Sequence, residues 1–189
     1  MRLFKFDAEQ AVRRAQREVD AERTRGPLTG AFLLKGGVLS LLVAAAVIAL
    51  ASRFSIAIAT QEYLCLPPYR IWIIDKYDTE PARGEIFAFA SVGLGPVFED
   101  GTTIVKVIEG MPGDEVSVGT QQVTINGEVV AEGLQVATDR GIDPARYVRS
   151  GTIEQERYWF FGKTPDSFDS RYWGSVSKSQ IIGKAYPLW

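Results

Sequence analysis

Two hydrophobic patterns divide the chain. Residues 36–52 carry no charge, and residues 30–52 are mostly apolar and long enough to cross a bilayer as one helix. From about residue 69 onward, apolar residues alternate with polar ones or form short runs rich in β-branched and aromatic side chains. Gly, Pro and Asn separate these runs, as is typical of turns between short strands. The pattern predicts a mainly β fold, a small closed or coiled β-domain that follows one N-terminal transmembrane helix.

The expected β-domain contains eight short strands. The turn Asn126-Gly127 is the strongest hairpin signal in the chain. Residues 134–155 are polar and are expected to be irregular, with one helical turn at 144–148. The strands are expected at residues 69–76, 85–90, 102–109, 115–118, 122–125, 128–130, 157–161 and 181–186.

Residues 1–29 are polar and rich in arginine, and a helix is expected up to about Arg25, capped by Asp7. Because the basic excess precedes the apolar segment, we expect the N-terminus to be cytoplasmic. The resulting division is a cytoplasmic polar helix (1–29), a membrane anchor (30–59) and an extracytoplasmic domain (60–189). The alternative is a cleaved signal peptide with Ala57-Ile58-Ala59 as its cleavage site, but its basic region would be far too long.

Composition restricts the chemistry. The 189 residues include no histidine and one cysteine, and the net charge is −2. The lack of histidine excludes Ser-His-Asp and Cys-His arrangements and speaks against a zinc site, and we expect neither a metal nor another cofactor. A near-neutral charge gives no indication of nucleic-acid binding. A general base must therefore be a lysine or a carboxylate.

Lys106 is the candidate base. It lies in a β-branched run, and strand alternation puts it on the same face as Ile104 and Ile108. An amine on an apolar face loses hydration, which favours the neutral form that can accept a proton. The alternative is an edge-strand lysine that extends its amine into water.

Two further motifs are specific. Residues 169–174, Asp-Ser-Arg-Tyr-Trp-Gly, precede Ile182-Gly183-Lys184-Ala185, and Lys106 lies seven residues before Gly113-Asp114. Both motifs resemble those of type I signal peptidases, and the resemblance covers the domain from about Tyr69 to Tyr186. The resemblance implies a membrane-anchored endopeptidase with a serine/lysine dyad that cleaves exported precursors after small residues. It matches Lys106 to the base, Ser167 to the serine that orients it, and Asp169 and Arg171 to a bracing pair, for which an ordinary loop salt bridge is an equal interpretation.

The chain departs from this family at the nucleophile. Where the family has a serine, Cys65 stands in Cys65-Leu66-Pro67. This context is similar to the branch that matures conjugative pilins, and a thiol loses its proton more readily than a serine hydroxyl. The alternatives are Cys65 as a small buried side chain and Ser55 as a substitute nucleophile. Because Tyr63 replaces a small hydroxyl residue, oxyanion stabilisation would depend on backbone N–H groups, such as that of Cys65.

The resemblance leads to one functional interpretation with two alternatives. The first is pilin processing in a conjugative type IV secretion system at the inner membrane, with the domain in the periplasm and with lipid, precursor and other conjugation proteins as partners. Water attack on the thioacyl intermediate gives hydrolysis, and attack by an amine gives transpeptidation or a cyclic product. The alternatives are a non-catalytic assembly factor and a general signal peptidase.

The sequence also suggests surroundings for this site. The apolar faces of residues 69–74 and 85–89 are expected to form the walls of the substrate pocket. Exposed aromatic residues such as Trp72, Phe98 and Trp189 are candidates for contact with the bilayer interface.

Overall fold

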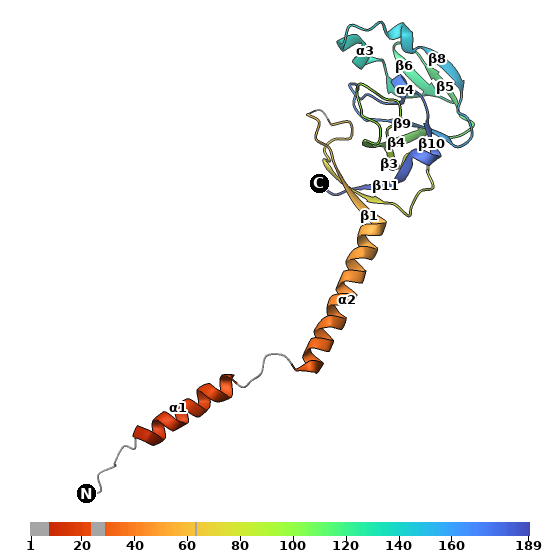
Figure 1. Cartoon of the computed structure of the whole chain (residues 1–189). Coiled ribbons are helices and arrows are strands. Elements are labelled where there is room, and N and C mark those ends of the chain that lie inside the picture. The colour runs from red at the N-terminus through yellow and green to blue at the C-terminus, as the bar shows by residue number, and fades with distance from the viewer. Residues whose placement is uncertain (1–7, 24–28, 63) are drawn as a thin grey trace. The chain divides into compact units, whose positions relative to one another are not determined.

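A computed structural model describes residues 8–23, 29–62 and 64–189, which form two compact units, Met1–Ala49 and Leu50–Trp189 (Figure 1). The first unit is helical. It contains α1 (Ala8–Arg23) and most of α2 (Gly30–Arg53). The expected cap Asp7 lies outside the described residues.

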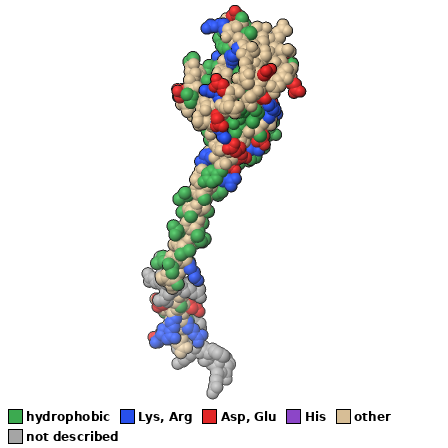
Figure 2. Space-filling model, turned by 90° about the vertical axis from the view of Figure 1, so that its right-hand side faces the viewer, with side chains coloured by type: hydrophobic (Ala, Val, Ile, Leu, Met, Phe, Trp, Pro, Cys, Tyr) green, Lys and Arg blue, Asp and Glu red, His purple; other side chains and the backbone are tan. Residues whose placement is uncertain are grey.

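Helix α2 is the one described helix that is long and apolar enough to cross a membrane. Its 24 residues extend about 36 Å at 1.5 Å per residue, and a bilayer's hydrocarbon core is about 30 Å thick. None of its side chains is buried, and Figure 2 shows hydrophobic side chains along it. A helix that exposes so many apolar side chains needs an apolar solvent, which agrees with the expected anchor.

The second unit is built from two antiparallel sheets, which confirms the mainly β prediction. The larger sheet has seven strands, in the order β1 (Phe54–Ile58), β2 (Ile71–Asp75), β11 (Ile181–Pro187), β3 (Ile86–Ala90), β4 (Thr103–Gly110), β9 (Arg157–Phe161) and β10 (Val176–Ser177). The smaller sheet has four, in the order β7 (Glu128–Glu132), β6 (Gln122–Ile125), β5 (Glu115–Val118) and β8 (Arg149–Thr152). The sequence predicted most of these strands but not their separation into two sheets.

Four short helices connect the strands. They are α3 (Gln135–Asp139), α4 (Ser170–Trp173) and the 3₁₀ turns η1 (Pro144–Tyr147) and η2 (Lys178–Gln180). The expectation that residues 134–155 are irregular apart from 144–148 was therefore wrong at α3 and β8. Strand β8 has the sequence Arg-Ser-Gly-Thr, which carries no strand pattern of its own, and it forms because it pairs with β5.

The apolar helix is shorter than the anchor predicted from the sequence. Residues 54–59 were assigned to it, but Phe54–Ile58 forms β1 and pairs with β2 in the register Phe54↔Asp75 to Ile58↔Ile71. Pairing satisfies the backbone of this segment in the sheet, so the helix ends at Arg53. The Arg53 guanidinium donates to both oxygens of Asp75, at 2.6–3.1 Å, and this bond lowers the pKa of Asp75. The ion pair joins the end of α2 to the sheet.

Strand β4 lies in the core and is buried on both faces. Ile104 and Ile108 pack with Phe87, Phe89 and Phe160 in one cluster, whereas Val107 packs with Trp72 and Ile74 in another. The expected alternation is confirmed, because Lys106 lies between Ile104 and Ile108 and is only 2 % exposed. Burial on both faces explains why this strand reads as an almost continuous β-branched run.

Asp114 joins three segments where β4 turns into β5. Its carboxylate accepts hydrogen bonds from the backbone N–H of Met111 and the amide of Asn126, and it forms an ion pair with Arg83 at 2.7 Å. Burial raises the pKa of Asp114, but the three donors outweigh it and hold the pKa below its ordinary value. The charged form of Asp114 therefore stabilises the fold.

We expect Asp114→Asn to reduce the free energy of unfolding at pH 7 by about 1–3 kcal/mol, because it removes the buried charge to which three donors bind. A lowered folded-state pKa contributes stability above the unfolded value of about 3.9, and that stability is lost as pH falls through the folded value. The variant should therefore lose less stability than the wild type on acidification. Urea unfolding of the detergent-solubilised chain, followed by tryptophan fluorescence between pH 7 and 2, measures both effects. The exposed neighbour Glu115, changed to Gln, is the control, and parallel pH profiles for Asp114→Asn and wild type would contradict the assignment.

Candidate active site

The amine of Lys106 is held at one hydroxyl. Its Nζ donates to Oγ of Ser167 at 2.7 Å, and Ser167 is fully buried. The ring of Trp173 lies with its centre 5.9 Å from Nζ and covers the amine. Among the described residues, Lys106 has no acidic partner, so its charge would be uncompensated in the core.

Ser167 is positioned by its own loop. Its N–H donates to the carbonyl of Thr164 at 3.1 Å, and its carbonyl accepts from Nη2 of Arg171 at 3.1 Å. Both backbone groups are thus fixed, which fixes the point on the loop from which the hydroxyl extends. The structure therefore brings together the predicted base and the predicted orienting serine.

Asp169 and Arg171 form a buried ion pair. Nε of Arg171 donates to Oδ1 of Asp169 at 2.8 Å, and Nη2 donates to Oδ2 at 2.9 Å, with exposed side-chain fractions of 1 % and 0 %. Burial lowers the pKa of Arg171, but the hydrogen bond and charge of Asp169 raise it above its ordinary value. The pair is thus a buried loop salt bridge, not an exposed surface one.

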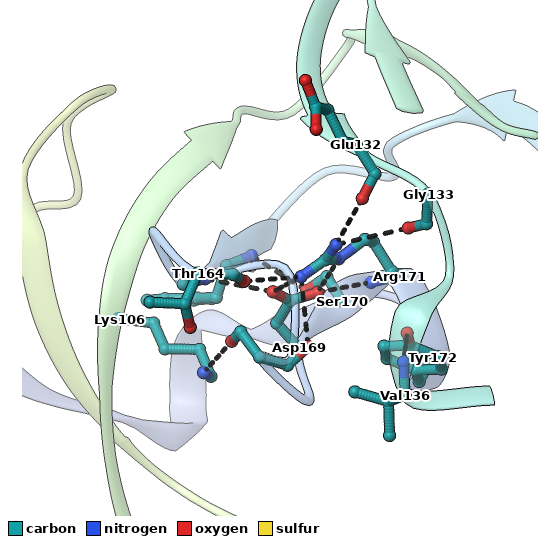
Figure 3. Close-up of polar contacts among 12 residues, drawn as sticks. Lys106, Glu132, Gly133, Val136, Thr164, Asp169, Ser170, Arg171 and Tyr172 are labelled. Atoms are coloured by element: carbon teal, nitrogen blue, oxygen red, sulfur yellow. Dashed lines mark hydrogen bonds and ion pairs between the residues drawn. The ribbon is translucent and has the colours of Figure 1, made fainter. Parts of the chain in front are cut away.

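The remaining guanidinium donors of Arg171 tie the loop to the smaller sheet. They reach backbone carbonyls at the end of β7 and in the loop itself, as Figure 3 shows for Glu132 and Gly133. The four acceptors are the carbonyls of Glu132 (2.8 Å), Gly133 (3.2 Å), Ser167 (3.1 Å) and Thr164 (3.3 Å). Asp169 in turn caps α4 and accepts from the N–H of Gly162, so the pair holds one loop against both sheets.

Cys65 enters the site through its backbone. Its carbonyl accepts from the N–H of Lys163 at 2.7 Å, next to Gly162. Its side chain is half-buried and lines a cavity of about 340 Å³ that Lys106 also lines. Among the described residues, no hydrogen bond joins its sulfur to the Lys106 amine. Tyr63, expected near the oxyanion, lies outside the described residues.

The cavity differs from the expected pocket on one side. Tyr69 and Trp72 form part of its wall, as expected, but residues 85–89 do not, because Phe87 and Phe89 are fully buried in the core. The wall opposite is formed by residues 57–61 and 102–106. Trp72 is 3 % exposed and packs edge-on against Tyr69, so the expectation that it is an exposed bilayer contact was wrong.

Ser55, the alternative nucleophile, lies in β1 opposite Ile74 and is not part of the cavity wall. In the described part of the chain, no three His, Cys, Asp or Glu residues converge as a metal site. Cys65 is thus the one thiol or hydroxyl nucleophile predicted from the sequence that shares a cavity with Lys106.

Gly162 is a functional position that the sequence did not reveal. A Cβ built there would lie 2.1 Å from Oγ of Ser167 and 3.1 Å from the carbonyl oxygen of Cys65. Any other residue would have to displace the serine that holds Lys106. A single sequence contains no sign of this requirement, because the contact joins residues that are far apart along the chain.

We expect Gly162→Ala to destabilise the protein by about 1–3 kcal/mol, because the added methyl overfills a close-packed contact with backbone and buried atoms. Denaturant unfolding of the full chain measures the change. Gly151 is the matched control, because a Cβ there meets nothing within 4 Å and Gly151→Ala should stay within about 0.5 kcal/mol of wild type. Equal stability of both variants would show that the site is more loosely packed than described.

We expect Arg171→Met to cost about 3–5 kcal/mol, because it leaves the carboxylate of Asp169 buried without a counter-charge. Arg171→Lys should recover only part of that loss, because an ammonium cannot reproduce the planar set of donors. The same unfolding assay compares both with Arg140→Met, which changes an exposed arginine. A loss for Arg171→Met no larger than that of the control would refute the bracing role.

Comparison with known proteins supplies the family. Residues 31–189 match the family model described as signal peptidase, peptidase S26. A probable signal peptidase I-2 of Synechocystis sp. (strain ATCC 27184 / PCC 6803 / Kazusa) is 31 % identical over 108 residues, 57 % of this chain and 47 % of the relative. The chain thus spans about half the length of that curated relative. A solved signal peptidase I from Enterococcus faecalis V583 is 26 % identical, with a TM-score of 0.36 over 56 % of this chain and 96 % of that one. Because the family model covers most of the sequence, the chain belongs to the signal peptidase S26 family.

Proposed function

We propose that this protein is a membrane-anchored endopeptidase that cleaves exported precursor proteins, with Cys65 as nucleophile and Lys106 as general base. One observation carries the proposal. A buried amine, hydrogen-bonded to a hydroxyl and without an acidic partner among the described residues, lies at the wall of a cavity that the chain's one cysteine also lines. Membership in the signal peptidase family supports a peptidase.

The reaction follows from these two groups. The neutral Lys106 amine takes the proton of the Cys65 thiol, and the sulfur attacks the carbonyl carbon of the scissile peptide bond. The resulting ammonium gives its proton to the leaving nitrogen as the C–N bond breaks, leaving a thioester on Cys65. Water then attacks the thioester while Lys106 takes a proton from it, and the C–S bond breaks as the Lys106 ammonium returns that proton to the sulfur.

The supporting residues have separate tasks in this scheme. Ser167 directs the amine of Lys106, and the Asp169–Arg171 pair fixes the loop that carries Ser167. Among the described residues, the N–H of Cys65 has no acceptor, which leaves it available for the developing oxyanion.

The larger sheet offers a way to bind an extended substrate. Strand β9 pairs with β4 only at Val107, Ile108 and Gly110, so residues 103–106 pair on one side only, with β3. Their free edge belongs to the wall of the cavity. A peptide can add there as a strand, with its backbone bound to β4 and its side chains in the apolar cavity.

The proposed orientation across the membrane follows from the distribution of basic residues. The basic residues that precede α2 would keep the N-terminus in the cytoplasm, and the β unit would lie on the outer side, in the periplasm of a cell with an inner membrane. Substrates would therefore be met as they emerge from the membrane.

The cysteine favours a specialised substrate. A thioester reacts well with amines, so an amine in place of water would give transpeptidation or a cyclic product. This chemistry and the Cys-Leu-Pro context support pilin maturation in a conjugative type IV secretion system over general precursor cleavage.

The missing hydrogen bond between Cys65 and Lys106 favours a second candidate, a non-catalytic assembly factor of the same system.

We expect Cys65→Ala to abolish processing of the pilin or precursor, with a loss of at least about 1,000-fold, because the variant removes the group that forms the thioester in the proposed mechanism. Cys65→Ser should retain some activity, because the hydroxyl can use the same amine. Mass spectrometry of the candidate pilin, with and without each variant, follows the cleavage and distinguishes linear from cyclic product. Ser55→Ala is the control, and normal processing in Cys65→Ala would refute the proposal.

A further inference from the structure

A second cavity, of about 310 Å³, is lined by residues next to those that line the first one. Lys106 lines the first cavity, and the next residue, Val107, lines the second. Lys163 lines the second cavity and donates its N–H to the carbonyl of Cys65. The two cavities therefore lie on either side of the backbone at Cys65 and Lys106. We call the second one the Glu109 cavity.

The Glu109 cavity combines an apolar floor with charged and polar groups. Val107, Val130 and Phe161 supply apolar surface, and Glu109, Lys163 and Thr164 supply the polar groups. Such a lining suits a ligand with an aliphatic stem and a polar head.

Glu109 is the unusual group. Burial raises the pKa of its carboxyl, although Arg83 and Lys163 both act to lower it. Among the described residues, its carboxylate has no hydrogen-bond or ion-pair partner. A half-buried carboxylate without a partner costs free energy, and a cation that reached it would recover that cost.

Thr164 provides a second, independent sign. Its hydroxyl oxygen is buried and has no hydrogen-bond partner among the described residues. Its carbonyl, by contrast, is used by Ser167 and Arg171. Buried hydroxyls normally have partners, and this one does not. Two residues that line the cavity, Glu109 and Thr164, therefore each carry an unpaired oxygen of a kind that accepts from N–H donors.

We propose that the Glu109 cavity is the subsite for the residues that follow the scissile bond, and that it takes a lysine or arginine side chain there. The inference rests on the proposed peptidase function. An extended peptide that fills the first cavity passes Cys65 and Lys106 and reaches the second, its cationic head at Glu109 and Thr164 and its stem on the apolar floor. The amine of Lys163 lines the same cavity and repels that cation.

The test compares peptide substrates that carry Lys or Gln at the first or second position after the cleavage site, with the full-length protein in detergent. The wild type should favour Lys by roughly 5–10-fold in kcat/KM, the range of a charge-assisted hydrogen bond. Glu109→Gln should remove the preference, Thr164→Val should reduce it, and Lys163→Gln should increase it. The control Glu128→Gln removes an exposed carboxylate outside the cavity wall and should change nothing. No preference in the wild type, or an unchanged one in Glu109→Gln, would overturn the assignment.

A binding measurement separates this inference from the proposed function. Fluorescence anisotropy of labelled hexapeptides from the mature side needs no cleavage, and lysine-dependent binding that Glu109→Gln weakens at least 5-fold would support the subsite even if no precursor is processed. Cleavage without such binding would leave the peptidase and overturn the subsite. Acetylated and free N-termini distinguish the side chain from an α-amine. Binding that requires the free α-amine and ignores lysine would also overturn the proposal.

Discussion

The buried ion pair of Asp169 and Arg171 is the interaction on which the rest of the site depends. Two ions taken out of water cost several kcal/mol each, and the cost is recovered only when geometry and hydrogen bonding are nearly complete. In this site both are nearly complete, because the Arg171 guanidinium donates two hydrogen bonds to the Asp169 carboxylate and also donates to four backbone carbonyls. Such a pair contributes less to net stability than to uniqueness, since the loop has one position that satisfies every partner.

That position also places the amine of Lys106, the proposed base. The loop that the pair fixes carries Ser167, whose hydroxyl holds the Lys106 amine, and it returns to β9 at Gly162, whose missing side chain leaves room for the same hydroxyl. Lys163, next along the chain, holds the carbonyl of Cys65. One short segment, residues 162–171, therefore positions the base and the backbone of the proposed nucleophile together. Nothing else in the described structure makes both contacts.

Features with a local cause in the sequence could be predicted, whereas features caused by residues far apart along the chain could not. The position of Lys106 on an apolar face of a strand was predictable, because alternation along 103–110 is a local pattern. Its choice as the candidate base followed from the absence of histidine. The loop pair was predictable from a specific motif, although its burial was not. Gly162 could not be found, since its requirement arises from Ser167 and Cys65, which are distant in sequence. Strand β8 was missed because partners in β5, not its own residues, make it a strand.

The direct passage from α2 into β1 limits how far the site can reach. Phe54 follows Arg53 without a linker, and the cavity wall begins at Ala57 and continues to Gln61. If each residue advances the chain by at most about 3.3 Å, the cleft opens no more than roughly 26 Å from the end of the anchor. If α2 spans a membrane as proposed, the cavity lies within that distance of the bilayer, and only peptide bonds near the lipid surface can reach it.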